Sequence, residues 1–433
     1  MAKFGKFPFI KPNFKKIPQF SEDASKCDEE DVREIIVERK VGFNTVEVLI
    51  VIIVSIIFGV VIGTSVSFFR HEYKGEKISS SLQELITVYN DILDNYYDDV
   101  DEGDLVDAAV KGMMSSLGDP FSTYMDEDKA VSFNESVDGS YQGIGVTMTV
   151  DEDNQFLVLA VSAGSPAAKV GIQEGDILLK IDGKSLDEVS NMVKEANSKT
   201  LKLTFIRDNQ EITKKVSLDT IDLVSVTSKV YSLNNGNTGY IYIDNFAANT
   251  YKQFKDELEK VEKKNIQSLI IDIRSNPGGH VSQAKKILEL FMKKGKVLYQ
   301  VQTKEDVSKI KDSTKTSRTY PVVLLTNSTS ASAAEILAAS FKDSYSDATL
   351  IGDTTYGKGT IQTAYSLSDG TSVKYTTEKW LTPKGKSINK KGITPDKTIL
   401  LTTEYYTNPC EDNDLQLQTA LDFLETERNT SEN

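Results

Sequence analysis

The sequence predicts an α/β multidomain protein that is attached to a membrane by a single N-terminal helix. Three observations lead to this prediction. A run of 22 uncharged residues lies near the N-terminus. Residues 138–222 contain short strand-like runs separated by turn residues, and residues 223–405 alternate continuous apolar runs with amphipathic helical patterns. The 433 residues are enough for two or three domains.

Composition narrows the functional classes. A hydrophobic content of 39% and a charged content of 26% are typical of a globular protein. The net charge of −14 argues against nucleic-acid binding, which needs a basic surface. The two cysteines, Cys27 and Cys410, fall on opposite sides of the uncharged run, so no disulfide is expected within one chain.

The uncharged run is "VLIVIIVSIIFGVVIGTSVSFF", residues 48–69. As a helix it would extend roughly 33 Å, enough to cross a hydrocarbon core of about 30 Å. A buried core helix would show a polar face, and a cleaved signal peptide would begin nearer the N-terminus. Basic residues gather before the run, which places residues 1–47 in the cytoplasm as a flexible tail and the rest of the chain outside. They include Lys3, Lys6, Lys11, Lys15, Lys16, Arg39 and Lys40, against Arg70 and Lys74 just after it. The expected location is therefore the cell membrane, with a single pass.

Residues 70–137 are predicted to be a helical region. Residues 77–97, "KISSSLQELITVYNDILDNYY", place apolar side chains at three- and four-residue spacing, which indicates an amphipathic helix. Residues 101–117 form a second helical pattern that ends at Gly118. We interpret both faces as sites of helix packing. A partner-binding or dimerising face is the alternative.

The next two regions differ in their predicted secondary structure. Residues 138–222 predict a small β-rich domain with two short helices, "SPAAKVG" and "SLDEVSNMVKEA". Residues 223–405 predict an α/β core with parallel strand pairs, because strands such as "SLIIDI" and "YPVVLLT" are each followed by a helix. Residues 406–433 should form a last helix and a tail.

Two loops follow strands of this core and run into helices, namely "IDIRSNPGGH" at 271–280 and "NSTSASAAEI" at 327–336. Sites form at the carboxyl ends of strands in such sheets. Ser332 at the helix start is either an N-cap or a nucleophile near the helix dipole. The turn at Gly278 and Gly279 could direct an N–H toward an oxyanion, and the Ala333 amide could be a second donor.

A nucleophilic serine needs a base, and the chain has only two histidines. His71 lies beside the predicted span, and His280 opens a helix just after Gly279. A lysine is the other candidate: Lys358 lies between two glycines in "GDTTYGKGTIQT", with Gln362 four residues on to hold the amine. The pKa of a lysine must fall from about 10.4 to roughly 7–8 for this task, which burial in an apolar cleft achieves. The alternative is an ordinary solvated lysine.

The same segment nearly matches a phosphate-binding loop. However, Gly359 stands where the magnesium-binding hydroxyl belongs, and a strand-like pattern follows instead of a helix. We therefore do not expect nucleotide binding.

Three ordered motifs resemble those of the C-terminal processing (tail-specific) serine proteases. "DIRSNPGG" is similar to that family's D-[LV]-R-x-N-P-G-G loop, "NSTSASAAE" to its N-x-x-S-A-S-A-[SA]-E loop and "TYGKGTIQ" to its T-[FY]-G-K-G-x-x-Q loop. The segment "DGTSVKYTTEKWLTPKGKSINKKGITPD" is similar to the one that follows in the family. The likeness covers roughly residues 78–427 and implies a core of the crotonase/Clp-protease type.

The resemblance also implies roles. It makes Ser332 the nucleophile, Lys358 the general base and Gln362 the third member, with Ser328 and Ser330 structural. It implies oxyanion donors at Gly278, Gly279 and Ala333. One departure is visible, since the stretch from Glu335 to Lys358 is one residue longer than the family pattern, which we place in a surface turn around "SYSDA".

The β-rich domain resembles a PDZ domain in "YQGIGV" and in "GSPAAKVGIQEGDILLKIDG". Successive backbone amides in its first loop could cradle a peptide's terminal carboxylate while the peptide adds as a strand. These residues are Gly143, Ile144, Gly145 and Val146.

The predicted function is a membrane-anchored serine endopeptidase that acts on extracytoplasmic proteins recognised through their C-termini. It needs no metal or organic cofactor, and a homodimer through residues 77–117 is plausible from the resemblance. Two alternatives stay open. One is a catalytically inactive, membrane-tethered PDZ scaffold, and the other is a hydrolase assisted by His280.

Overall fold

The computed structural model describes residues 79–151, 154–185 and 200–431. The chain divides into two compact units, 1–109 and 110–433. The predicted span at 48–69 and the tail before it lie outside the described residues, as does nearly all of the helix predicted at 185–196. Within the described ranges, no helix combines the length and the apolar character needed to cross a membrane.

Two amphipathic helices follow in the positions that the periodicity predicted. Helix α2 (Ser80–Asn95) begins where the Ser79 hydroxyl accepts a hydrogen bond from the Leu82 amide. Helix α3 (Glu102–Ser116) begins with two acidic residues in its first turn and continues into the second unit. Neither helix buries a side chain. The two helices contact each other through the Tyr89 hydroxyl, which donates to Glu102 at 2.6 Å, while most of their apolar side chains are exposed.

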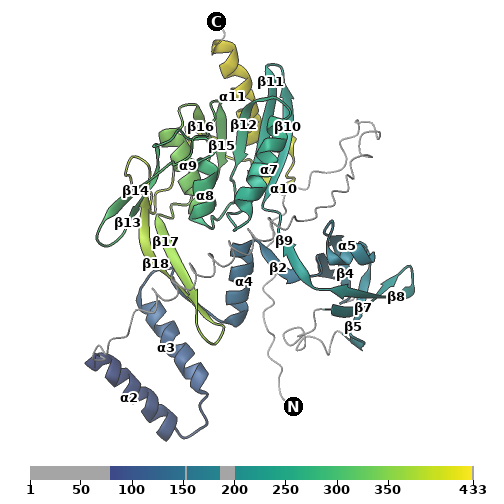
Figure 1. The fold of residues 1–433 in the computed structure, drawn as a ribbon, viewed down its shortest axis with the longest axis vertical. Helices are drawn as coiled ribbons and strands as arrows, with labels where there is room; N and C mark the ends of the chain where they lie inside the picture. Colours follow the sequence, from purple (N-terminus) through teal and green to yellow (C-terminus); the bar gives the residue numbers. More distant parts are fainter. Residues whose placement is uncertain (1–78, 152–153, 186–199, 432–433) are drawn as a thin grey trace, which may run out of the picture. The chain divides into compact units, whose positions relative to one another are not determined.

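The β-rich domain contains an antiparallel sheet of six strands (Figure 1). Its strands run in the order β3 (Val146–Val150), β4 (Phe156–Val161), β5 (Ile177–Ile181), β7 (Thr200–Arg207) and β8 (Gln210–Ser217), with β6 (Lys184–Ser185) paired to β5. The short helix α5 (Pro166–Val170) packs its buried Ala167 into the same core as Phe205 and Val216. A two-stranded pair, β2 (Ser140–Gly143) and β9 (Asp219–Asp222), brackets the domain. Strand β3 is an edge strand of the described sheet.

A buried carboxylate, Asp176, links the segment before β5 to Arg207 on strand β7. Asp176 has no exposed surface and accepts two hydrogen bonds from the Arg207 guanidinium and one from the Gln173 amide. Burial alone would raise the pKa of Asp176, but these hydrogen bonds and the positive charge hold it below its usual value.

The core of the second unit is a six-stranded sheet with the order β10 (Val226–Leu233), β11 (Gly236–Ile243), β12 (Ile266–Asp272), β15 (Val322–Thr326), β16 (Ala348–Gly352) and β19 (Lys397–Thr398). All neighbours from β11 onward are parallel, and only β10 pairs antiparallel to β11. This confirms the predicted α/β core with parallel pairs. The loops after β12, β15 and β16 therefore leave the sheet at one edge from neighbouring strands.

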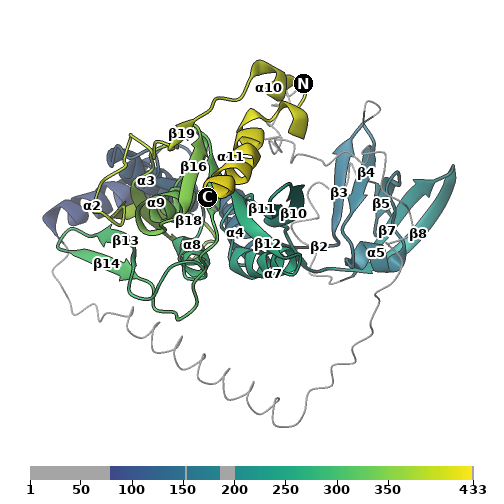
Figure 2. The ribbon, with the colours of Figure 1, turned by 90° about the horizontal axis from the view of Figure 1, so that it is seen from above.

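Helices cover both faces of this sheet (Figure 2). Alternate strand residues such as Ile271 and Leu324 pack against α7 (Thr250–Glu262), α8 (Val281–Leu288) and α9 (Ala333–Ser344). The residues between them, such as Ile270 and Leu325, pack against the C-terminal helix α11 (Leu415–Ser431). Strands buried on both faces explain the continuous apolar runs in the sequence.

A second sheet was not predicted. Strands β1 (Thr123–Met125), β18 (Ser372–Leu381), β13 (Val297–Gln302) and β14 (Val307–Lys311) lie in this order, and β17 (Thr360–Ser366) also pairs with β18. The helix α4 (Glu127–Asp138) and the short helices α10 (Thr403–Thr407) and η1 (Glu411–Asn413) complete the described elements. Strand β17 matters for the site because it follows the lysine loop and carries Gln362, and β18 matters because it pairs with β17.

We expect Asp176→Asn to destabilise the β-rich domain by about 1–3 kcal/mol at pH 7, because it removes the buried charge that the partly exposed Arg207 guanidinium contacts. A carboxylate whose folded pKa is depressed stabilises the fold above its unfolded pKa and loses that effect as pH falls through the folded value. The difference from wild type should therefore shrink below about pH 4. Hydrogen exchange of β7 and β8 in the full chain, corrected for intrinsic rates, measures it.

Glu174→Gln, which changes an exposed carboxylate two residues away, is the matched control and should leave this exchange unaltered. An equal difference at pH 7 and pH 3 would contradict an ionised Asp176.

Candidate active site

Ser332 lies in a strained turn between β15 and α9. Its φ of 56° and ψ of −116° are unusual for a residue with a side chain. Such strain persists only where the surroundings hold it, and it is frequent at active sites. The residue is partly exposed, while Ala331 and Ala333 on either side are buried. Ser332 is thus presented at the start of a buried helix, where the dipole favours negative charge.

The loop around Ser332 is fastened to the end of β12. The buried Ser330 hydroxyl donates to the Ile273 carbonyl at 2.8 Å and accepts from the Asn327 amide at 3.0 Å. The Asn327 side chain in turn accepts from the Ser275 amide. Ser330 therefore has the structural role that the resemblance implied, whereas Ser328 is exposed.

The glycine turn at 278–279 packs directly against Ser332. A β-carbon at Gly278 would come within 2.7 Å of the Ser332 β-carbon and 3.0 Å of the Ala333 amide nitrogen. Its φ of 100° is also in the range that favours glycine. The Ala331 amide donates to the carbonyl of Asn276, which locks the two loops together. The structure therefore brings together the two loops that the sequence singled out.

One predicted oxyanion donor is engaged elsewhere. The Gly278 amide donates to the side-chain oxygen of the buried Asn276 at 2.8 Å, so in this conformation it is not free for an oxyanion. By contrast, the amides of Gly279 and Ala333 donate to no acceptor in the described part of the chain. The geometry favours these two as donors. Sequence patterns could not foresee the inward turn of Asn276.

The lysine loop joins β16 to β17 beside the other two loops. The Tyr356 amide donates to the Ser330 carbonyl, and the Trp380 indole donates to the Lys358 carbonyl at 2.8 Å. Added β-carbons at Gly357 and Gly359 would lie 2.8 Å from atoms of the 389–392 segment. As the sequence predicted, the flanking glycines let another backbone pack closely against Lys358.

The Lys358 side chain is partly buried, and its surroundings favour the neutral amine. Burial lowers the pKa of Lys358 below its usual value, and the charge of Lys374 lowers it further. The carboxylates of Asp119 and Glu335 oppose this shift. The ammonium nitrogen lies 4.7 Å from the centroid of the Phe121 ring and makes no hydrogen bond with a described residue.

Gln362 does not hold the amine in this conformation. Its side-chain nitrogen donates to the hydroxyls of Thr360 at 2.8 Å and Thr376 at 3.1 Å. The side chain lies on β17, four residues after Lys358, where the sequence placed it. Thr360 lies on β17 itself, whereas Thr376 lies on the adjacent strand β18. The sequence had not indicated that β18 is a neighbour of β17.

Glu335 is the residue whose importance the sequence analysis missed. Its side chain has no exposed surface. One oxygen accepts from the amides of Ser332 at 2.9 Å and Lys358 at 2.8 Å. The other accepts from the Thr355 hydroxyl at 2.6 Å and the Gly357 amide at 2.7 Å. A serine followed three residues later by glutamate at a helix start is a capping-box pattern, which would have signalled the first contact only.

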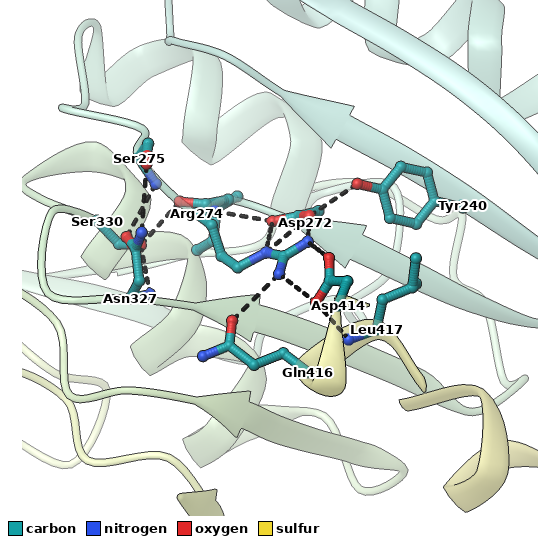
Figure 3. Close-up of polar contacts among 10 residues, drawn as sticks. Tyr240, Asp272, Arg274, Ser275, Asn327, Ser330, Asp414, Gln416 and Leu417 are labelled. Atoms are coloured by element: carbon teal, nitrogen blue, oxygen red, sulfur yellow. Dashed lines mark hydrogen bonds and ion pairs between the residues drawn. The ribbon is translucent and has the colours of Figure 1, made fainter. Parts of the chain in front are cut away.

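Arg274, in the first loop, was also missed. It is buried between Asp272 at the end of β12 and Asp414 before α11, at 2.5 and 2.8 Å (Figure 3). Gln416 accepts a further bond from the guanidinium, and the buried Tyr240 hydroxyl donates to Asp272. The network joins the C-terminal helix to the strand that carries the glycine turn. The D-x-R spacing in the motif was its only sequence signal.

The other predicted site residues are resolved as well. His280 precedes α8, and its side chain makes no capping hydrogen bond. Within the described ranges, no group of three or more His, Cys, Asp or Glu side chains could hold a metal ion. In the β-rich domain, Gly143 ends β2, Gly145 has a φ of 79°, and Val146 begins the edge strand β3.

The fold and the site define a serine peptidase with a PDZ domain, and comparisons with known proteins agree. The family model for peptidase family S41 matches residues 237–399, and a PDZ domain model matches residues 157–207. A third model, the N-terminal domain of the activating protease CtpB, matches residues 64–129.

Two curated relatives extend this match over most of the chain. The carboxy-terminal processing protease CtpA of Bacillus subtilis is 39% identical over 323 residues, which are 73% of this chain and 68% of that protein. A probable CtpA-like serine protease of Staphylococcus haemolyticus is 33% identical and covers 87% and 77%. The solved photosystem II D1 C-terminal processing protease is 23% identical, with 81% of this chain and 98% of that chain covered and a TM-score of 0.45. The chain belongs to peptidase family S41 and is a serine-type carboxy-terminal processing peptidase.

We expect Glu335→Gln to lower kcat more than it changes KM, because an NH₂ group would replace an oxygen that accepts backbone N–H donors of the serine and lysine loops. Each buried donor left unpaired costs about 1–3 kcal/mol, so stability should fall as well. Initial rates on an unstructured test protein and a thermal melt of the same preparation measure the two effects.

Glu289→Gln changes a buried carboxylate bound to Lys285 and Ser313, away from these loops. It should cost stability without the loss in kcat. If both variants lost rate equally per degree of melting temperature, the positioning role of Glu335 would be excluded.

Proposed function

We propose that the peptidase works through a Ser–Lys pair, with Ser332 as nucleophile and Lys358 as general base. One observation carries this proposal: a single oxygen of the buried Glu335 accepts the backbone amides of both residues. Two residues whose amides share one oxygen must lie at a common site. The strained Ser332 turn and the lowered pKa of Lys358 support the same roles.

In the proposed reaction, neutral Lys358 takes the Ser332 proton as the hydroxyl oxygen attacks the peptide carbonyl carbon. The amides of Gly279 and Ala333 stabilise the oxyanion. The lysine ammonium then gives its proton to the departing amine, and an acyl-enzyme remains. Water, deprotonated by the lysine, then attacks the ester carbonyl carbon. The lysine returns that proton to the departing Ser332 oxygen, which releases a new C-terminal carboxylate and restores the free serine and the neutral lysine. In this proposal the Gln362 side chain rotates away from Thr360 and Thr376 and hydrogen-bonds to the Lys358 amine, which holds the amine in place.

We expect Ser332→Ala and Lys358→Ala each to lower kcat by about 10⁴-fold or more, because nucleophile and base act as a unit. In wild type, kcat/KM should fall as pH falls, since protonation removes the base. The midpoint should lie below the 10.5 of an ordinary lysine, because burial lowers the pKa of Lys358. A pH series of initial rates with the full chain in detergent tests both.

His280→Ala separates this proposal from the histidine-assisted alternative and should retain activity. An inactive His280 variant beside an active Lys358→Ala enzyme would refute the Ser–Lys pair. Equal residual cleavage in wild type and Ser332→Ala would instead support the inactive scaffold.

We further propose that the PDZ domain binds substrate C-termini. The glycine loop between β2 and β3 offers backbone amides to a carboxylate, and the positive φ of Gly145 fits such a turn. Strand β3 is an edge of the described sheet, with Thr147, Met148, Thr149 and Val150 exposed, so a peptide could add beside it. Bound substrates would be extracytoplasmic proteins with accessible, largely apolar C-termini.

We expect a peptide ending in apolar residues with a free carboxylate to bind Ser332→Ala protein at least about tenfold more tightly than its C-terminal amide. The amide lacks the charge that the loop amides would bind. Calorimetry or fluorescence anisotropy measures the two affinities, and a peptide with a charged last residue is the specificity control. Equal binding of acid and amide would argue against carboxylate recognition.

Membrane anchoring and dimerisation complete the proposal. The uncharged run at 48–69 and the basic residues before it support a single pass with the peptidase outside the cytoplasm. Exposed apolar side chains on α2 and α3 support a homodimer through these helices. They include Leu82, Leu85, Ile86, Val88, Val106 and Met113.

A further inference from the structure

A short segment that precedes the β-rich domain lies against the catalytic lysine. We call residues Asp119–Ser122 the strap. It connects the end of α3 to β1, and β1 pairs antiparallel with β18, with Thr123 opposite Lys374. This pairing fixes the strap beside β18, which also pairs with the strand that carries Gln362.

The strap contacts the Lys358 side chain through an aromatic ring. The Phe121 centroid lies 4.7 Å from the ammonium nitrogen, within the range of a cation–π interaction. The same ring makes an edge contact with Tyr356 in the lysine loop, at 6.5 Å between centroids. Phe121 therefore faces both the loop and the charged end of the lysine.

The strap also reaches Gln362 through a chain of hydrogen bonds. Asp119 accepts from the hydroxyls of Ser122 and Thr376, each at 2.6 Å. The Thr376 oxygen in turn accepts from the Gln362 amide at 3.1 Å, and the Thr376 amide donates to the Ser122 hydroxyl. Burial would raise the pKa of Asp119, but these bonds hold it below its usual value, so it is ionised at neutral pH.

We propose that the strap positions the catalytic pair, with the Phe121 ring holding the Lys358 side chain and Asp119 holding Gln362 through Thr376. This inference rests on the proposed role of Lys358 as the base. Phe121, Asp119 and Thr376 are positioning residues, because they act through Lys358 and Gln362 rather than on the substrate.

The Phe121 ring has a predictable electrostatic effect. It attracts the ammonium and not the neutral amine, so it opposes the effect of burial on the lysine. Three charged groups act on Lys358 from the neighbouring elements: Lys374 on β18, Asp119 in the strap and Glu335 on α9. Without the ring, only the two carboxylates would favour the protonated form, and the lysine would lose its proton at lower pH.

The decisive experiment compares the pH dependence of kcat/KM for full-length wild type and Phe121→Leu on an unstructured test protein. Leucine keeps an apolar side chain and removes the π-face. We expect the midpoint of the acid limb to move down by about 0.5–1 pH unit. Phe121→Tyr restores an aromatic face and should bring the midpoint back to the wild-type value.

Phe423→Leu is the matched control, since the Lys397 nitrogen lies 4.3 Å from that ring in a remote helix. It should leave the midpoint unaltered. An unmoved midpoint in a folded Phe121→Leu enzyme, or an equal shift in the Phe423 control, would overturn the role of Phe121.

The second arm tests the link to Gln362 and decides the matter if Phe121→Leu fails to fold. Thr376→Val keeps the β-branched shape and the backbone amide that Ser122 contacts. We expect a three- to tenfold loss in kcat with little change in KM, about the worth of one hydrogen bond. Combining it with Gln362→Ala should cost no more than Gln362→Ala alone. Fully multiplicative losses would overturn the link.

Failure of this inference is distinguishable from failure of the proposed function. If Lys358→Ala retains activity, the Ser–Lys assignment falls and the strap has no catalytic lysine to position. If Lys358→Ala is inactive while Phe121→Leu keeps the wild-type midpoint and Thr376→Val keeps the wild-type kcat, only the strap proposal falls.

Discussion

The site depends on one buried carboxylate, Glu335. Removing an ionised group from water is costly, and four donors must surround it before that cost is offset. These donors come from two loops, with the Ser332 amide on one side and Thr355, Gly357 and Lys358 on the other. Glu335 therefore receives all four hydrogen bonds only when the serine loop and the lysine loop lie against each other as observed. This couples the presentation of the serine to that of the lysine.

The parallel sheet makes this assembly possible. Strands β12, β15 and β16 are neighbours, so the three loops that follow them begin within two strand spacings of one another. The buried cluster of Arg274, Asp272 and Asp414 then ties the first of these strands to the C-terminal helix. These three buried groups are hard to pull apart, because separating the arginine from either carboxylate would leave a buried charge without its partner, which is strongly destabilising.

The pKa of Lys358 is set by opposing effects and not by burial alone. Burial and Lys374 favour the neutral amine, whereas the Phe121 ring and two carboxylates favour the ammonium. The base that we propose must also return its proton to a leaving group, and a group with that task works best when its pKa lies near the operating pH. The strap contributes two of the opposing groups, although it lies far from the loop in the sequence.

The sequence by itself determined the central parallel strands β11, β12, β15 and β16 and the helices α7, α8 and α9, because burial leaves a local pattern. It also singled out Ser332, Lys358 and Gln362 as candidates. It further indicated that the glycines on either side of Lys358 let another backbone segment pack closely against the loop. Only the tertiary structure decided that the Gly278 amide is engaged by Asn276, that Gln362 contacts Thr376, and that Glu335 joins two loops. The contact of Asp119 with Thr376 spans 257 residues. Such pairings, like those of the second sheet, depend on which strands become neighbours, and no local period records that choice.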